Sequence, residues 1–509
     1  MYKHELERVT PESVGISSRK LLEMVKSLEK ITEMHGLMVA RHGKVILEGW
    51  WKPYTADLPH ICHSFGKSYV GTAVGLAITE GYLHLDDHIT DLFAGELQAF
   101  HVPLTENLKK LTIEHQLMMA NGMSVHAASG EHLLRNYLTT DVDHEPGKRF
   151  LYNTTGSCML GAAVMRTTGK SIRQYLTEGI FDKIGIESDK LEWMSFHHNG
   201  VHAAPGVAAT TENNLRLGML YLQYGAWNGE QLIDREWMER ATTRRIRTDV
   251  INAESHTDTG AGYGYQLWIC EEPGTFKFAG GHGQDSVMSR PNDLVISINQ
   301  SANDGMSHAE NEILSEYLLR DSIPDAALPD DPEAFQALQD YMAGLALPSL
   351  TPSPLPYDAA LWDGIYRLDS GDVHVNTELR PMTDANVYTD FYDHDDVICR
   401  EFSLEGKDGF IEVVLDDGTI RTVLKARLDG VLEPIASVGA IPIYRKTVST
   451  AEVTPDSLII RTKFLQTCFW STLIICKDPN GGISIECRKE RLHEDKPYFT
   501  LCGHFCKII

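Results

Sequence analysis

The sequence lacks long hydrophobic runs and is poor in basic residues. No apolar stretch approaches the ~18–20 residues that a membrane-spanning helix needs, and the N-terminal stretch Met-Tyr-Lys-His-Glu-Leu-Glu-Arg contains no apolar signal region. Lys and Arg total 46 against 71 Asp and Glu, which gives a formal net charge of -25. Because nucleic acids and anionic membranes bind basic surfaces, we expect neither as a partner.

The sequence also lacks a paired cysteine framework. Its nine cysteines are an odd number, which is typical of reduced thiols in a cytosolic protein, so we expect a cytoplasmic location. Groups that resemble parts of a metal site have no partners at a recognised spacing: Cys502 with Cys506, His60 with His63, and His197 and His198 with His202. We therefore expect no metal site and no cofactor.

The length predicts two or three domains with ample cores. The first part of the chain mixes helical and strand periodicity and contains no repeat. Helices are expected over residues 17–31, 112–119, 211–221 and 310–319. Two more are expected, one from Ser64 towards Gly81 and one that ends near residue 165. Strands are expected over residues 37–40, 45–47, 262–269, 276–283 and 294–298. Strands at both ends of a helical middle predict an α+β domain built on an antiparallel sheet.

The last third of the chain has the pattern of an all-β domain. Four prolines within residues 348–356 predict a stiff linker. Hairpins are expected beyond it, from residues 410–415 with 420–424 and from 473–476 with 483–487. About 150 residues of short strands predict a closed barrel or a sandwich. The expected division is a first domain at residues 1–346, a linker at 347–356 and an all-β domain at 357–509.

Ser64 and Lys67 form a Ser-x-x-Lys pair at the start of a predicted helix, on one face and one turn apart. A serine hydroxyl is a poor nucleophile unless a base activates it, and a buried lysine with a lowered pKa can do so. The same spacing at residues 17–20 and 27–30 lies on a predicted surface helix. The apolar surroundings of Ser64 favour catalysis there, and the alternative is that Ser64 only caps its helix.

Six segments, taken in order, resemble the serine β-lactamase and penicillin-binding-protein superfamily in its class C-like branch. They are residues 42–44, 64–67, 81–87, 146–161, 206–210 and 279–284. That branch includes esterases, D-aminopeptidases, 6-aminohexanoate-oligomer hydrolases and acyltransferases. The resemblance covers about residues 8–320 and implies an antiparallel sheet flanked by helices, with a mostly helical second lobe. Some relatives carry a lipocalin-like barrel after this domain, and we expect one here.

The resemblance implies roles for three side chains. Ser64 would be the acylated nucleophile, Lys67 its activating partner, and Tyr152 the phenol that passes a proton between serine and leaving group. The alternative for Tyr152 is a core aromatic with a satisfied hydroxyl. The usual Tyr-x-Asn reads Tyr152-Asn153-Thr154 here. Because a threonine hydroxyl cannot copy the two-sided contact of an amide, this departure argues against β-lactam or peptide recognition.

The last motif of that superfamily, Lys-Thr-Gly or His-x-Gly, reads Gly281-His282-Gly283-Gln284 here. His282 would replace the cation that polarises the site, or would be an ordinary strand histidine. A backbone N–H in this segment would complete an oxyanion hole with that of Ser64. We count Asn153, Thr154 and residues 281–284 as candidate substrate-binding or oxyanion-binding positions.

These observations predict a serine hydrolase that acts on a carboxylic ester or small amide through an acyl-enzyme. One alternative is an acyltransferase with the same residues, in which an alcohol or amine outcompetes water. Another is a non-catalytic protein that binds or assembles on this fold, although the intact Ser64, Lys67 and Tyr152 argue against it. The expected partner is a small-molecule substrate, and a homo-oligomer is left open.

Overall fold

In the computed structural model the chain divides into two compact units. One consists of Met1–Trp50 with Ala56–Leu345, and the other of Trp51–Thr55 with Ala346–Ile509. No helix in the part of the chain that the structure describes is long and apolar enough to cross a membrane. The described residues are 5–125, 132–195, 200–248, 261–302, 306–371, 399–416, 421–436, 446–468, 470–479, 482–490 and 499–508.

The first unit is built on a seven-stranded antiparallel sheet with the order β2-β1-β12-β11-β10-β9-β8. Its strands are β1 (Glu33–Arg41), β2 (Lys44–Trp50), β8 (Gly262–Tyr263), β9 (Trp268–Ile269), β10 (Thr275–Gly280), β11 (Gln284–Ser289) and β12 (Leu294–Ser301). The N-terminal hairpin joins the late strands where Leu37 on β1 pairs with Ile298 on β12. The expectation of an antiparallel sheet assembled from both ends of this segment is confirmed.

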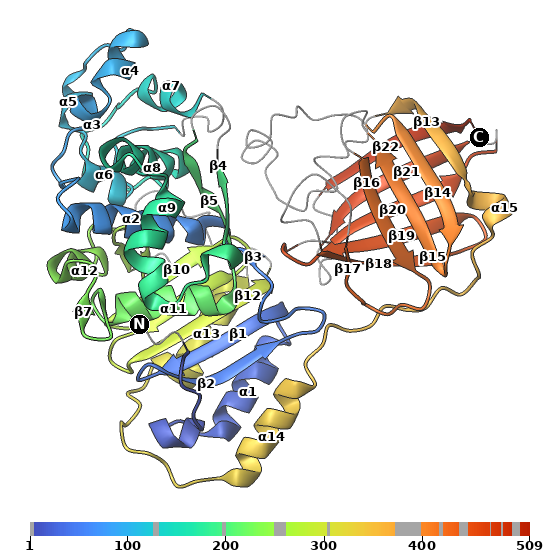
Figure 1. Cartoon of the computed structure of the whole chain (residues 1–509), viewed down its shortest axis with the longest axis horizontal. Helices are drawn as coiled ribbons and strands as arrows, with labels where there is room; N and C mark the ends of the chain where they lie inside the picture. The colour runs from blue at the N-terminus through green and yellow to red at the C-terminus, as the bar shows by residue number, and fades with distance from the viewer. Residues whose placement is uncertain are drawn as a thin grey trace. The chain divides into compact units, whose positions relative to one another are not determined.

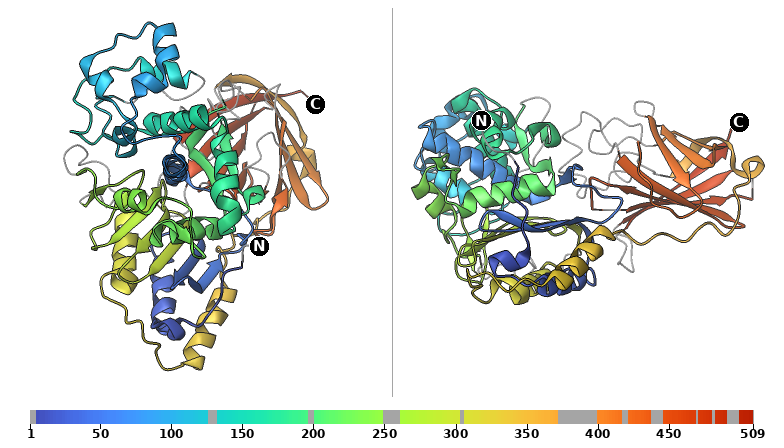
Figure 2. Two further views of the ribbon diagram at one scale, coloured as in Figure 1. Left: turned by 60° about the vertical axis from the view of Figure 1, so that its left-hand side comes forward. Right: turned by 60° about the horizontal axis from the view of Figure 1, so that its bottom comes forward.

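Helices cover both faces of this sheet (Figure 1, Figure 2). Helix α11 (Thr211–Leu222) packs against β1, β11 and β12. Helices α1 (Ser18–Leu28), α13 (Met306–Leu314) and α14 (Pro332–Ala343) pack together on the opposite face. The residues that α1 buries recur every three to four positions, as the amphipathic pattern predicts: Leu21, Met24, Val25 and Leu28.

A mostly helical lobe lies between the two groups of strands in the sequence. Its centre is α2 (Gly66–Thr79) packed on α8 (Thr154–Thr168) and on β5 (His202–Ala209). Close packing there requires small residues, because a Cβ on Gly66 would lie 2.1 Å from the Ala204 carbonyl oxygen. The short strands β3 (His60–Ile61) and β4 (Glu192–Ser195) flank β5 in a second sheet.

Shorter elements complete the first unit. The helices are α3 (Ile89–Leu92), α4 (Ala94–Ala99), α5 (Glu106–Lys110), α6 (Ile113–Leu117), α7 (Leu133–Leu138), α9 (Ile172–Leu176), α10 (Asp182–Ile184) and α12 (Arg235–Ala241). The strands β6 (Ala226–Trp227) and β7 (Glu230–Gln231) form a small hairpin. Single helical turns are η1 (Pro11–Val14), η2 (His63–Phe65), η3 (Thr177–Phe181), η4 (Ser188–Lys190) and η5 (Ser315–Leu319).

Two strand predictions were wrong in detail. Residues 262–269 form not one strand but the β8–β9 hairpin, because Gln266 adopts a left-handed φ of 58° and its N–H donates to the Leu117 carbonyl. The strand expected over residues 276–283 ends at Gly280, and the chain turns back into β11, which was not expected. The buried face of β11 carries polar residues, so it has no strand-like alternation of apolar and polar side chains.

The second unit is a β-barrel. Among its described residues nine strands form a closed ring, because β16 also pairs with β18 at Arg427 and Thr450; this closing pair is parallel, whereas the other neighbouring strands of the ring pair antiparallel. The strands are β13 (Gly364–Gly371), β14 (Glu401–Lys407), β15 (Phe410–Asp416), β16 (Arg421–Arg427), β18 (Lys446–Val453), β19 (Ser457–Phe464), β20 (Trp470–Lys477), β21 (Ile483–Glu490) and β22 (Phe499–Lys507), with β17 (Ile435–Ala436) added to β18 and α15 (Ala359–Trp362) before β13. Both expected hairpins are present, as β15–β16 and β20–β21.

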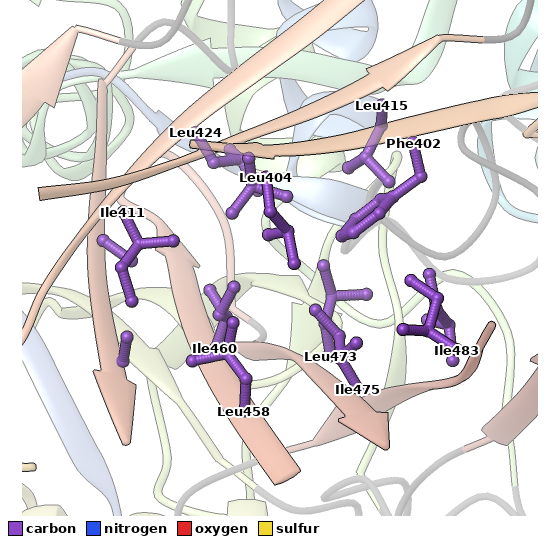
Figure 3. Packing of buried hydrophobic residues seen from close by; sticks show 14 of the residues in the cluster. Phe402, Leu404, Ile411, Leu415, Leu424, Leu458, Ile460, Leu473, Ile475 and Ile483 are labelled. Atoms are coloured by element: carbon purple, nitrogen blue, oxygen red, sulfur yellow. The ribbon is translucent and has the colours of Figure 1, made fainter. Parts of the chain in front are cut away.

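Apolar side chains fill the interior of the barrel. Phe402, Leu404, Ile411, Leu424, Leu458, Ile460, Leu473 and Ile475 point toward one another from opposite walls (Figure 3). A barrel of this strand number is just wide enough for side chains to fill it. The packed interior supplies the core of this unit.

Candidate active site

Ser64 lies in the turn η2, between β3 and α2. Lys67, in the first turn of α2, is 1% exposed and donates a hydrogen bond of 2.8 Å from Nζ to Ser64 Oγ. Ser64 does not cap α2: the residue at that position is Phe65, and no side chain caps the helix. The residue before the serine, His63, has a left-handed φ of 48°, a conformation that tends to occur at functional sites.

Tyr152 lies beside the same amine. Lys67 Nζ lies 4.7 Å from the centroid of the Tyr152 ring, within the range of a cation–π contact. The hydroxyl, the amine and the phenol-bearing ring are therefore neighbours, although about 90 residues separate Ser64 from Tyr152 in the sequence. The structure thus brings together the three side chains that were predicted to catalyse the reaction.

An aromatic wall holds the Tyr152 ring. The ring stacks on Trp268 at 5.7 Å with an interplanar angle of 17°, and Tyr263 meets it edge-on at 6.3 Å. Phe150 and Met119 complete the buried cluster behind it. Burial, with the neighbouring Tyr152, holds the pKa of Tyr263 well above its usual range, so Tyr263 stays neutral as part of this wall.

The two residues after Tyr152 have different surroundings. Asn153 is fully buried, and its Oδ1 accepts a 2.8 Å hydrogen bond from the Gly156 N–H as the cap of α8. Its side chain therefore caps the helix, and its predicted contact with substrate stays a prediction. Thr154, the first residue of α8, is half-buried and stays a candidate for substrate contact.

Glycines bring the end of β10 against the nucleophile. A Cβ on Gly280 would lie 2.0 Å from the Cys62 carbonyl oxygen, and one on Gly281 would lie 3.7 Å from the His63 ring. The strand ends at Gly280, and Gly281 follows it beside His63. His282 is not a strand residue, because it lies in the β10–β11 turn (residues 281–283) with a φ of 65°.

Side-chain amides brace the β10–β11 turn. Gln284 is buried, and its Nε2 donates to the carbonyls of His282 at 3.1 Å and Gln300 at 2.6 Å. Gln300 Nε2 in turn donates to the Gly283 carbonyl at 3.0 Å. Gln284 therefore supports the turn from within the sheet, and its predicted contact with substrate stays a prediction. The ring of His282 meets the ring of His63 edge-on, with centroids 5.1 Å apart.

The candidate metal ligands that the structure describes do not gather at one site. Among the described residues no cluster of three or more His, Cys, Asp or Glu could hold a metal ion. His60 bonds to His35, and burial lowers the pKa of His202 to about 4, so His202 is neutral. His197 and His198 lie outside the described residues. All nine cysteines are free thiols.

Sequence reasoning missed Trp268 and Tyr263 as parts of the site. Their segment reads Gly-Tyr-Gly-Tyr-Gln-Leu-Trp, and its two glycines and Gln266 were a signal for a turn rather than a strand. The ring contact between His63 and His282 had no signal in the sequence, because it depends on the approach of β10 to the Ser64 turn.

Comparisons with known proteins show what this chain is similar to. The family model described as Beta-lactamase matches residues 28–316. A 6-aminohexanoate-dimer hydrolase of Paenarthrobacter ureafaciens is 24% identical over 302 residues, which cover 54% of this chain and 74% of that protein. Among solved structures, a family VIII carboxylesterase is 14% identical with a TM-score of 0.48, covering 61% of this chain and 99% of its own. SurE is 13% identical with a TM-score of 0.47 and covers 96% of this chain and 99% of its own.

Proposed function

Because this chain belongs to the beta-lactamase family, we propose that it is a serine hydrolase that forms an acyl-enzyme on Ser64 and acts on a carboxylic ester or a small amide. The observation that carries this proposal is the 2.8 Å hydrogen bond from the buried amine of Lys67 to Ser64 Oγ. A serine paired with a buried base at this distance has the geometry of an activated nucleophile.

The proposed reaction proceeds in two half-reactions. Ser64 Oγ attacks the acyl carbon, and its proton passes to Lys67. Tyr152, whose ring faces the amine, returns a proton to the departing alcohol or amine as the bond to the acyl carbon breaks. Water then attacks the acyl-Ser64 ester, loses its proton to the same pair, and releases the carboxylic acid and the free serine.

Backbone N–H groups stabilise the oxyanion in this proposal. Ser64 supplies one N–H, and Gly281 supplies the other, because Gly280 packs against the carbonyl of Cys62. Preorganised donors of this kind contribute about 2.7–4 kcal/mol each to transition-state stabilisation. The amide braces on the β10–β11 turn support this role, since they fix the carbonyls of His282 and Gly283, which follow the Gly281 N–H in the same turn.

The surroundings of Tyr152 favour a substrate with an apolar portion. Phe150, Tyr263 and Trp268 form the wall beside it, and Ala279 at the end of β10 packs against the same cluster. The relative named as a 6-aminohexanoate-dimer hydrolase supports keeping amides in the proposal beside esters. The hydroxyl of Thr154 in place of an amide weighs against β-lactams.

A fluorophosphonate probe followed by peptide mass mapping tests the nucleophile. We expect the label on Ser64 in the folded protein, with none in Ser64→Ala and full labelling in the surface variant Ser27→Ala. An unlabelled Ser64 in folded protein would favour the non-catalytic alternative. A library of esters and amides, assayed with and without an alcohol or amine acceptor, then separates hydrolysis from acyl transfer by whether the acid or the acceptor adduct accumulates.

We also propose a cytoplasmic location. All nine cysteines are free, as is usual in the reducing cytosol. Fractionation of the native host with antibody detection tests this proposal, and recovery in an extracellular or envelope fraction would contradict it.

A further inference from the structure

A chain of buried polar side chains leads to the nucleophile segment (residues 61–64). Glu33 Oε1 and His35 Nε2 are 2.9 Å apart, and His35 Nδ1 and His60 Nε2 are also 2.9 Å apart. His60 Nδ1 lies 3.0 Å from the Ile61 carbonyl oxygen. The three side chains are only 4%, 1% and 3% exposed. The chain of hydrogen bonds therefore runs inside the protein from β1 to the residue three positions before Ser64.

The backbone conformation directs these side chains toward one another. The pairing of β1 with β12 shifts register between Met34 and Gly36, so His35 is the extra residue of a β-bulge. Bulges re-aim a side chain that would otherwise follow the pleat of its strand, and they are common beside active sites. His60 opens β3, which pairs with β5 through Ile61 and Ala208. The bulge thus ties the large sheet to the short strand from which the chain enters the Ser64 turn.

The hydrogen bonds fix the number of protons on this chain. A carbonyl oxygen only accepts, so His60 Nδ1 must carry a proton. Each of the three hydrogen bonds needs one proton, whereas two neutral imidazoles and an ionised carboxylate supply two. The chain therefore holds one further proton, on an imidazole or on the Glu33 carboxyl. Without that proton one of the three buried hydrogen bonds is lost, which is costly.

We propose that Glu33, His35 and His60 form a proton-holding chain that positions the nucleophile segment for catalysis. This inference rests on the proposed function, and the three residues are positioning residues because none of them touches the Ser64 hydroxyl in the described contacts. His60 anchors Ile61 from one side, while the Cys62 N–H donates to the Val207 carbonyl at 2.7 Å on the other. The two anchors fix the peptide units that lead into Ser64.

Glu33→Gln tests the proton count. Its amide N–H donates to His35 Nε2 without an added proton, so two neutral imidazoles then complete all three hydrogen bonds. For the best ester found in the library, we expect kcat of Glu33→Gln to lie within about threefold of wild type. We expect kcat of Glu33→Ala to be at least about tenfold lower than wild type. Equal losses in the two variants would overturn the proton count.

Alanine variants of the histidines test the positioning role. We expect His35→Ala and His60→Ala each to lower kcat at least about tenfold with KM within about twofold of wild type, since substrate binding is not the step affected. Because the chain acts as a unit, the double variant should lose no more than either single one. The matched control is His42→Ala, a half-buried histidine of the β1–β2 turn paired with Asp293, which should leave kcat unchanged. Unchanged kcat in His60→Ala, or losses that multiply in the double variant, would overturn the proposal.

Thermal unfolding separates this inference from the proposed function. An unreactive Ser64 in the wild-type protein would count against the hydrolase itself. The melting series still decides whether the chain holds its proton: Glu33→Gln should melt within about two degrees of wild type and Glu33→Ala several degrees lower. A Glu33→Gln variant that melts as low as Glu33→Ala would overturn the inference whatever the activity.

Discussion

The carbonyl of Cys62 lies directly against Gly280, so closely that a Cβ at residue 280 would be 2.0 Å from its oxygen. The two residues are far apart in the sequence and belong to different parts of the fold: one leads into the Ser64 turn and the other ends β10. In the proposed mechanism this contact sets how near the Gly281 N–H comes to the nucleophile. Space rather than backbone conformation requires the glycine, because φ of Gly280 is not in the left-handed region.

Gly280→Ala should therefore separate the two segments. We expect a fall in kcat of about a hundredfold or more, because the oxyanion donors no longer converge. We also expect an overpacking cost of about 1–3 kcal/mol in the free energy of unfolding. Steady-state kinetics and urea unfolding measure the two effects. The control is Gly95→Ala in α4, where a Cβ would meet nothing within 4 Å; normal activity in Gly280→Ala would mean that Gly281 is not an oxyanion donor.

Ser64→Ala and Tyr152→Phe test the chemistry without disturbing the packing. Ser64 is half-buried, and Tyr152→Phe keeps the ring that stacks on Trp268. Each change should lower turnover by about a thousandfold or more, with the melting temperature within a few degrees of wild type. A large fall in melting temperature would instead show that the residue is structural.

Glu310 should make stability depend on pH. Burial, followed by the nearby Asp285 carboxylate, raises the pKa of Glu310 to about 8, although the Lys277 ammonium and a hydrogen bond from Gln300 act in the other direction. Its ordinary value is about 4.5, so above that pH the unfolded chain ionises while the folded carboxyl stays protonated. The contribution of protonated Glu310 to the free energy of unfolding is fully present below about pH 4.5 and is lost as pH rises through about 8.

Thermal unfolding at several pH values measures this effect. Glu310→Gln, which cannot ionise, should melt close to wild type at about pH 5 and several degrees above it at about pH 8.5. Glu312→Gln, a change at a neighbouring carboxylate two residues along the chain, serves as the control. Parallel melting curves for wild type and Glu310→Gln across this range would show that Glu310 is ionised throughout.

Local patterns predicted the parts of the fold that depend on nearby residues. The hairpin across Arg41–Lys44 and helix α8 followed from turn residues and spacing within one segment. Helix α14 was not predicted, although Asp331 caps it and Pro332 begins it. Its N-terminal signals were present in the sequence.

In the candidate site, too, the features set by nearby residues could be predicted and those set by distant contacts could not. The pairing of Ser64 with Lys67 is set by helical spacing, so the sequence could predict it. The register of β10 depends on the contact between Cys62 and Gly280, which no local pattern encodes. The bond from His35 to His60 depends on a β-bulge and on two strands that meet only in the folded chain, so it could not have been predicted.

Thr154 should restrict the substrate. It stands in place of the asparagine of the Tyr-x-Asn motif that the sequence resemblance implies, at the first residue of α8, and is half-buried. A hydroxyl offers one hydrogen bond where an amide offers a donor and an acceptor, so a substrate amide is held less well. We expect wild type to hydrolyse its best ester at least about a hundredfold faster than a chromogenic cephalosporin, judged by kcat/KM.

Thr154→Asn should narrow that ratio by raising kcat/KM for the cephalosporin about tenfold, which corresponds to about 1.4 kcal/mol of added transition-state stabilisation. Ester turnover should change little, because an ester has no N–H to donate a hydrogen bond to the side-chain carbonyl of the new asparagine. The control is Thr154→Val, which keeps the size of the side chain and removes its hydrogen bond, and so should not gain activity toward the cephalosporin. If wild type hydrolyses the cephalosporin as fast as simple esters, Thr154 does not exclude β-lactams and the substrate class must be drawn more widely.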